Sequence, residues 1–141
     1  MKTKFIGLLL LSLSIFSSCN KNDDDSPANA DVRTVATTGN WRVTYFFDDN
    51  RDQTSFFSGY TFTFGSNNTV TAAKGSTTLA GTWATDTDDS KSKLVIAFAG
   101  PSGFDELTED WLVIESSANR IKLQHTSGGN GTTDYLTFER N

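Results

Sequence analysis

The chain has few of the residues that form covalent cross-links or metal centres. Its 141 residues include one cysteine, one histidine and two prolines. A single cysteine excludes a disulfide framework and a cysteine-rich zinc site. A single histidine excludes a centre built from several histidines, and it leaves little for histidine-based acid–base chemistry. We expect neither a metal nor a cofactor.

Positive charge is also scarce. Twelve lysines and arginines stand against 17 aspartates and glutamates, which gives a net charge of −5. Proteins that bind nucleic acid commonly present a basic face, so this balance argues against a nucleic-acid partner. The length suits one folded domain.

The chain has no apolar run long enough to cross a membrane, and its longest apolar run lies at the start. Residues 5–16 read FIGLLLLSLSIF and follow Lys2 and Lys4. A membrane span needs about 20 apolar residues, so this run is too short. A positive start, a short apolar run and then small residues are typical of a secretory signal peptide, which we assign to residues 1–18.

The sequence Phe16-Ser17-Ser18-Cys19 resembles the lipobox of bacterial lipoproteins. The resemblance implies cleavage before Cys19, lipidation of its thiol and attachment of the mature chain to a membrane. The alternative is an ordinary signal peptide followed by a chance cysteine.

Residues 19–38 are polar and show no apolar period, so we expect a flexible acidic tether. Its segment KNDDD, residues 21–25, resembles the signal that sends some lipoproteins to the outer face of the outer membrane. That resemblance implies a cell-surface location, and the alternative is a solvated run of charge.

From residue 39 to 141, apolar and polar residues alternate with a period of two, which indicates strands. Eight candidate strands cover 41–45, 60–64, 69–72, 78–83, 94–98, 111–114, 120–124 and 136–139. Most connections between them are short, which favours antiparallel pairing. We predict an all-β domain that forms a small eight-stranded antiparallel up-and-down barrel, because closure removes exposed sheet edges. A two-sheet sandwich is the alternative.

The alternation places many aromatic side chains inside this barrel. The inward residues are Trp41, Tyr45, Tyr60, Phe62, Phe64, Trp83, Phe98 and Phe138. They either fill the interior as a packed core or line a pocket for a small ligand. Phe56, Phe57 and Phe104 lie on long connections, where they either plug the end of the barrel or gate a cavity. The candidate ligand-binding residues are Tyr45, Phe56, Phe57, Tyr60, Phe62, Phe64, Trp83 and Phe98.

Gly39-Asn40-Trp41 at the first strand resembles the lipocalin fingerprint, in which the tryptophan closes one end of the barrel. The resemblance implies that Arg140, near the end of the last strand, stacks over Trp41. The stretch 39–141 as a whole resembles the lipocalin-like domains of bacterial surface lipoproteins, through segments such as 59–64, 81–83, 109–113 and 135–139. This resemblance implies a barrel and an envelope location, and little about a ligand.

Catalytic and calcium-binding patterns are weak. His125 has no nucleophile motif, and the acids Asp105, Glu106, Glu109 and Asp110 share one connection, as in a solvated loop. The segment 48–52 matches only the first half of a calcium loop. We therefore expect a lipoprotein that is not an enzyme and that binds a small apolar or amphipathic ligand. The alternative is a protein- or glycan-interaction module, or an envelope-complex subunit, with a filled barrel.

Overall fold

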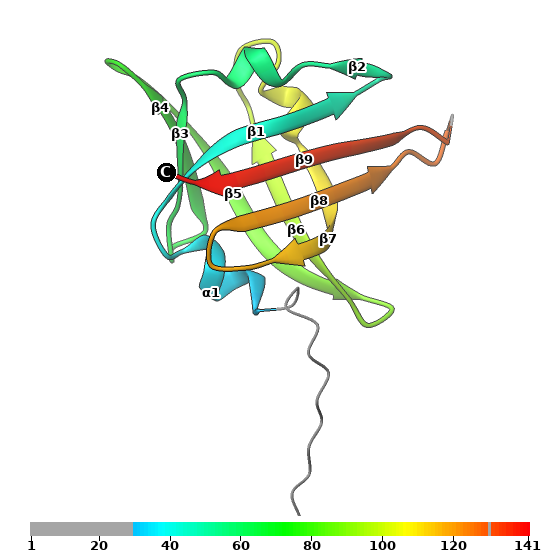
Figure 1. Cartoon of the computed structure of the whole chain (residues 1–141). Helices are drawn as coiled ribbons and strands as arrows, with labels where there is room; N and C mark the ends of the chain where they lie inside the picture. Colours follow the sequence, from blue (N-terminus) through cyan, green and yellow to red (C-terminus); the bar gives the residue numbers. More distant parts are fainter. Residues whose placement is uncertain (1–29, 130) are drawn as a thin grey trace, which may run out of the picture.

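The computed structural model describes residues 30–129 and 131–141 (Figure 1). The predicted signal peptide, Cys19 and the acidic segment 21–25 lie outside the described residues. Within those two ranges, no helix combines the length and the apolar character that a membrane crossing requires.

Nine strands make up most of the described chain, with one short α-helix and two 3-10 helices. In chain order these are α1 (Val32–Ala36), β1 (Asn40–Asp48), β2 (Arg51–Asp52), η1 (Thr54–Phe57), β3 (Thr61–Phe64), β4 (Thr69–Lys74), β5 (Thr77–Asp88), β6 (Lys91–Phe98), η2 (Asp105–Leu107), β7 (Glu109–Ser116), β8 (Arg120–Thr126) and β9 (Thr133–Arg140).

The strands form a closed antiparallel barrel. Strands β1 and β3 to β9 pair in chain order, and β9 returns to pair with β1. Strand β2 pairs only with the end of β1 and stands outside the closed ring. The predicted eight-stranded up-and-down barrel is therefore confirmed. Strand β2 was not predicted, because two residues are too few to show an alternating pattern.

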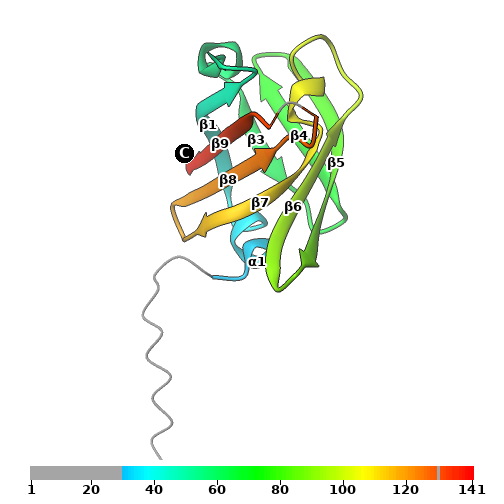
Figure 2. The same ribbon diagram turned by 90° about the vertical axis from the view of Figure 1, so that its right-hand side faces the viewer.

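Helix α1 corrects the predicted tether, which was drawn to residue 38. The Asp31 side chain accepts hydrogen bonds from the backbone N–H groups of Arg33 and Thr34 and so caps the helix. Val32, Val35 and Ala36 are buried in the core. The folded body therefore begins before residue 39, and α1 lies against one end of the barrel (Figures 1 and 2). A helix of one turn is too short to show a helical period in the sequence.

Trp41 joins α1 to the barrel. Its indole Nε1–H donates a hydrogen bond of 2.9 Å to the carbonyl oxygen of Ala36. The guanidinium of Arg140 lies 5.3 Å from the centre of the indole ring, so the predicted cation–π contact is present. Gly39 has a φ of +103°, and a Cβ there would lie 3.5 Å from the Arg140 side chain. Glycine therefore suits the turn that brings α1 under the indole.

The barrel interior is filled by aromatic rings. Phe62 makes edge-to-face contacts with Phe98 and Phe138, and Phe64 does so with Trp83 and Phe138. Each of these five side chains is at most 5% exposed. Rings that interlock in this way pack like an ordinary protein core.

We predict that Phe62→Ala lowers the free energy of unfolding by about 3–5 kcal/mol, because it removes a fully buried ring from the centre of this packing. Phe56→Ala is the matched control, since Phe56 is 46% exposed and the same truncation there should have a much smaller effect. Urea denaturation followed by tryptophan fluorescence measures both. A loss below about 1 kcal/mol for Phe62→Ala would show that the interior is not tightly packed.

Candidate functional site

The residues predicted to bind a ligand divide into three groups. Phe62, Phe64, Trp83 and Phe98 belong to the filled interior. Tyr60 is partly buried against the same core, with its ring 5.0 Å from that of Phe104. The geometry of this group matches the packed-core alternative.

The loop phenylalanines form the second group and plug one end of the barrel. Phe57 and Phe104 are each 1% exposed, with ring centres 5.4 Å apart. Phe56 covers them from outside, and its ring centre lies 6.0 Å from that of Phe104. Gly103 has a φ of +100°, and a Cβ there would lie 2.4 Å from the Phe56 ring, so glycine is favoured at this position. These contacts favour an end plug.

Tyr45 is the third case, and its predicted inward direction is wrong. The pairing of β1 with β9 shifts register between Val43 and Tyr45, which marks a β-bulge at Thr44. The extra residue reverses the alternation, so Phe46 becomes 1% exposed while Tyr45 is 40% exposed. Sequence alternation alone gives no signal for this shift.

A second register shift occurs in β7, between Val113 and Glu115. The shift turns Ser116 inward, whereas Ile114 already points outward by alternation with Trp111 and Val113 and is 46% exposed. Between the two shifted strands lie β8 and β9, and the four strands form the wall that faces the viewer in Figure 1. One outer wall therefore carries Tyr45, which the shift in β1 turns outward, and Ile114, which alternation places there.

This wall carries a groove of about 530 Å³ on its outer surface. The outer groove is lined by Thr44, Tyr45, Ile114, Arg120, Lys122, Leu123, Gln124, Tyr135, Thr137 and Glu139. Tyr135 is 40% exposed, and the Phe47 ring beside the groove stands nearly parallel to that of Tyr45, at 14° and 6.3 Å. Because Tyr135 alternates with the buried Leu136, its outward direction could have been read from the sequence.

Polar side chains cross the same wall in rows. Lys122 pairs with Thr137, which in turn pairs with Tyr45, and Gln124 pairs with Tyr135, which pairs with Phe47. Each row therefore ends on an aromatic ring. An exposed patch of this kind, apolar with a polar surround, is typical of an interaction site.

The charges near the groove are paired with each other. The Arg120 guanidinium lies 2.9 Å from Glu115, and Lys122 lies 3.7 Å from the same carboxylate. Arg42 lies 3.7 Å from Glu139. These three cations and two carboxylates sum to +1, so the groove has no strong charge of either sign on a protein that is negative as a whole.

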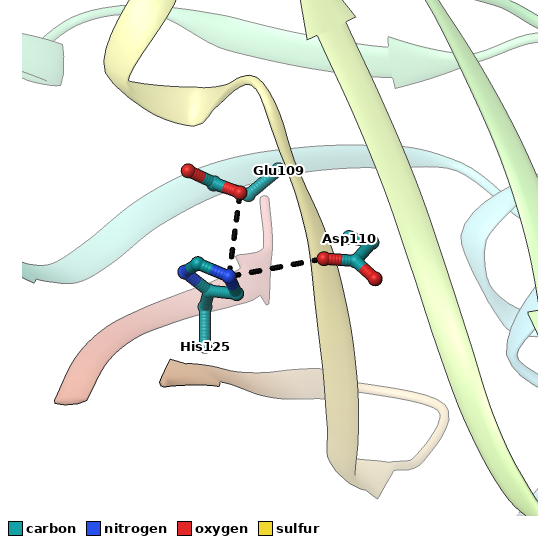
Figure 3. Close-up of side chains that lie close together, drawn as sticks. All are labelled: Glu109, Asp110 and His125. Carbon is teal, nitrogen blue, oxygen red and sulfur yellow. Dashed lines mark ion pairs between the residues drawn. The ribbon is translucent and has the colours of Figure 1, made fainter. Parts of the chain in front are cut away.

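A different cluster surrounds His125, where β7 begins and β8 approaches its end (Figure 3). The imidazole Nε2 lies 3.4 Å from Glu109 and 3.8 Å from Asp110, and Nδ1 lies 3.7 Å from Asp134. The imidazole ring meets Trp111 edge to face, with 6.1 Å between ring centres. Glu109 and Asp110 were expected on one solvated connection, apart from His125, but they begin β7, and its pairing with β8 brings all three side chains together.

Lys93 completes the surroundings of this cluster. Its ammonium group donates a 2.8 Å hydrogen bond to one oxygen of Asp110 and lies 3.3 Å from Asp88. The hydrogen bond from Lys93 is the main reason why the pKa of the Asp110 carboxyl lies below its ordinary value. Asp110 therefore stays ionised across the neutral range.

Two further acids lie near this end of the barrel. Burial, followed by the charge of Asp134, raises the pKa of Asp48. Burial, followed by the charge of Asp48, raises the pKa of Glu106. The partial calcium pattern at 48–52 is explained by a hairpin, because Asp49 and Asn50 have φ values of 45° and 61° between the paired ends of β1 and β2.

Comparison with known proteins shows a related fold. The chain is similar to the crystal structure of a DUF4847 family protein from Bacteroides vulgatus ATCC 8482, with a TM-score of 0.53 and 19% identity. The match covers 78% of this chain and 97% of that one. At this identity the likeness shows the barrel fold alone. No family model and no curated protein matches the sequence.

We predict that Asp48→Asn raises the melting temperature at pH 7. Because the pKa of Asp48 is raised in the folded state, the ionised carboxylate destabilises the fold at neutral pH. The asparagine oxygen can still accept the hydrogen bond from Gln53. The gain should vanish as the pH falls below the ordinary value of 3.8, where the aspartate is protonated in both states.

Asp52→Asn is the opposite control. Hydrogen bonds from Thr54 lower the pKa of Asp52, so its charge stabilises the fold above its ordinary pKa. Asp52→Asn should lower the melting temperature at pH 7. Thermal unfolding at pH 7 and pH 3 measures both variants, and a lower melting temperature for Asp48→Asn at pH 7 would contradict the argument.

Proposed function

We propose that this chain is a non-catalytic envelope protein that binds a neutral glycan in the outer groove. The observation that carries the proposal is the combination of Tyr45, Phe47 and Tyr135 with rows of hydrogen-bonding side chains on one wall. The packed interior supports a site outside the barrel, in place of the expected small apolar ligand within it.

Sugar rings have the chemistry that this wall complements. One face of a pyranose ring carries C–H groups, which pack on the flat face of an aromatic side chain. The hydroxyl groups around the ring need donors and acceptors, which Gln124, Lys122 and Thr137 supply between the aromatic residues. A groove with apolar walls and a few placed polar groups suits such an amphipathic ligand.

The paired charges favour a neutral glycan over an acidic one. Arg120 and Lys122 both face Glu115, and Arg42 faces Glu139. A sulfated or carboxylated sugar would have to compete with these carboxylates and approach a protein of net negative charge. A neutral sugar meets neither cost.

Native gels that contain one neutral polysaccharide at a time test the proposal, with β-glucan, xylan, galactomannan and α-mannan as probes. We expect at least one of them to retard the protein. Tyr45→Ala and Tyr135→Ala should each weaken that retardation about 5- to 10-fold, because a stacked ring contributes about 1 kcal/mol or more.

Phe56→Ala serves as the control, because it removes an aromatic ring of similar exposure that does not line the groove. It should leave retardation unchanged. The proposal fails if the unmodified protein migrates normally through all four polysaccharides, or if the two tyrosine variants bind as well as the control.

We further propose that Cys19 is lipidated and holds the domain on the outer surface of the outer membrane. The apolar run at 5–16, the small residues before Cys19 and the acidic segment at 21–25 support this location. Several acyl chains would hold the protein far more firmly than one.

Cys19→Ser should abolish labelling of the protein by radioactive palmitate in the bacterium, because no thiol remains for the lipid. Ser18→Ala keeps a small residue before the cysteine, so this control should still be labelled. Surface exposure is measured by adding protease to intact cells. Label on the Cys19→Ser chain would exclude lipidation at this thiol.

A further inference from the structure

The imidazole of His125 lies among three carboxylates without a hydrogen bond of normal length to any of them. Its contacts with Glu109, Asp110 and Asp134 measure 3.4, 3.8 and 3.7 Å. A nitrogen–oxygen hydrogen bond spans about 2.7–3.2 Å. Within the described chain, Nδ1 is buried and has no hydrogen-bond partner. If these groups only formed ion pairs, we would expect the imidazole and the carboxylates to approach to hydrogen-bond distance.

The Glu109 contact matches the spacing of ligands around a metal ion, and the Asp110 contact is slightly wider. Bonds of about 2.0–2.2 Å in a tetrahedral zinc site place neighbouring ligand atoms about 3.3–3.6 Å apart. Nε2 of His125 and one oxygen each of Glu109 and Asp110 all lie within 4.8 Å of one another. Figure 3 shows both carboxylates turned toward Nε2. The side chains of Glu109 and Asp110 are partly exposed, so a small movement of each would bring both carboxylates to bonding distance from one ion.

The second nitrogen of His125 is placed as in many metal sites. A histidine that binds a metal usually directs its other ring nitrogen at a carboxylate or carbonyl, which fixes the ring. Here Nδ1 faces Asp134, whose side chain is only 9% exposed. The backbone N–H of Asp49 holds the other Asp134 oxygen at 3.4 Å. This buried acid is separate from the two exposed carboxylates, and a small turn of the ring would bring Nδ1 within hydrogen-bond distance of it.

We propose that Glu109, Asp110 and His125 bind a divalent transition-metal ion, for which Zn²⁺ is the natural probe, with Asp134 as the residue that positions the imidazole. A solvent-open hollow of about 310 Å³ beside Asp110 and His125 provides an entry path and room for a water ligand. Lys93 holds the far oxygen of Asp110 and leaves the near one directed at the imidazole. The ion would fasten β7 to β8 at the end of the barrel opposite α1.

The ligand set distinguishes between classes of cation. Calcium and magnesium prefer oxygen ligands, and calcium takes six or more of them. One imidazole nitrogen with two carboxylate oxygens suits zinc and its neighbours in the first transition row. The site should therefore bind Zn²⁺ and leave Ca²⁺ unbound.

Isothermal titration of the untagged full chain in nonionic detergent tests the proposal. All variants carry Cys19→Ser, so that no thiol competes for the metal. We expect one equivalent of Zn²⁺ to bind, and His125→Gln to weaken binding at least 100-fold. Asp134→Asn should weaken it about 10- to 100-fold, as loss of a carboxylate behind a metal-binding histidine does.

Glu115→Gln is the matched control for charge. It removes one negative charge from the opposite end of β7, where Glu115 contacts Arg120 and Lys122. Zinc binding should be unchanged in this variant. Equal weakening by Glu115→Gln and His125→Gln would mean that zinc is attracted only by the general negative charge, and the proposal would be overturned.

A nitrogen-15 spectrum of the unsubstituted ring gives a test that needs no variant at position 125. His125 is the only histidine in the chain, so its two ring signals need no assignment by mutation. Zn²⁺ should move the Nε2 signal strongly, while Ca²⁺ at the same concentration should not. Ring signals that stay in place as Zn²⁺ is added would refute coordination by His125.

Discussion

The hydrogen-bonded ladder between β1 and β9 turns an open sheet into a closed surface. Strand β1 pairs with β3 only at Asn40 and Trp41, whereas it pairs with β9 from Trp41 to Phe47. Without this second ladder, both strands would present unpaired backbone groups at a sheet edge. Closure also gives the interior a fixed volume. Aromatic rings fill that volume, so both proposed binding sites lie outside it, one on the outer wall and one at an end of the barrel.

The ladder between β1 and β9 is irregular at one residue, and this irregularity changes which side chains of β1 face outward. The bulge at Thr44 lets β1 bend while it stays paired with β9, and it turns Phe46 inward and Tyr45 outward. Ile114 of β7 points outward by ordinary alternation with Trp111 and Val113. Two strands that flank β8 and β9 therefore each direct an apolar side chain outward, and together they border the groove. The Tyr45 side of the groove exists because β1 departs from strict alternation.

The same irregularity explains how far the sequence could predict the structure. Strands with strict alternation, such as β3 with Phe62 and Phe64 on one face, were placed correctly because a buried face dictates the period. Tyr45 was misplaced because the bulge has no glycine or proline to mark it. Helix α1 was missed because Val32 and Val35 alone cannot show a helical period. Only strand pairing brings together the residues around His125. Neither their spacing in the sequence nor the composition could therefore predict this cluster.

The two ends of β7 lie at opposite ends of the barrel and have different neighbours. At the end of β7, the Ser116 carbonyl oxygen accepts a hydrogen bond from Ala30, the first described residue. At its start lies Glu109, which faces His125. Eight residues of strand separate these ends by roughly 25 Å. With the proposed anchor at Cys19, the chain enters the barrel at the α1 end. The proposed metal site lies at the opposite end of the barrel from this entry, and the groove lies on the wall between them.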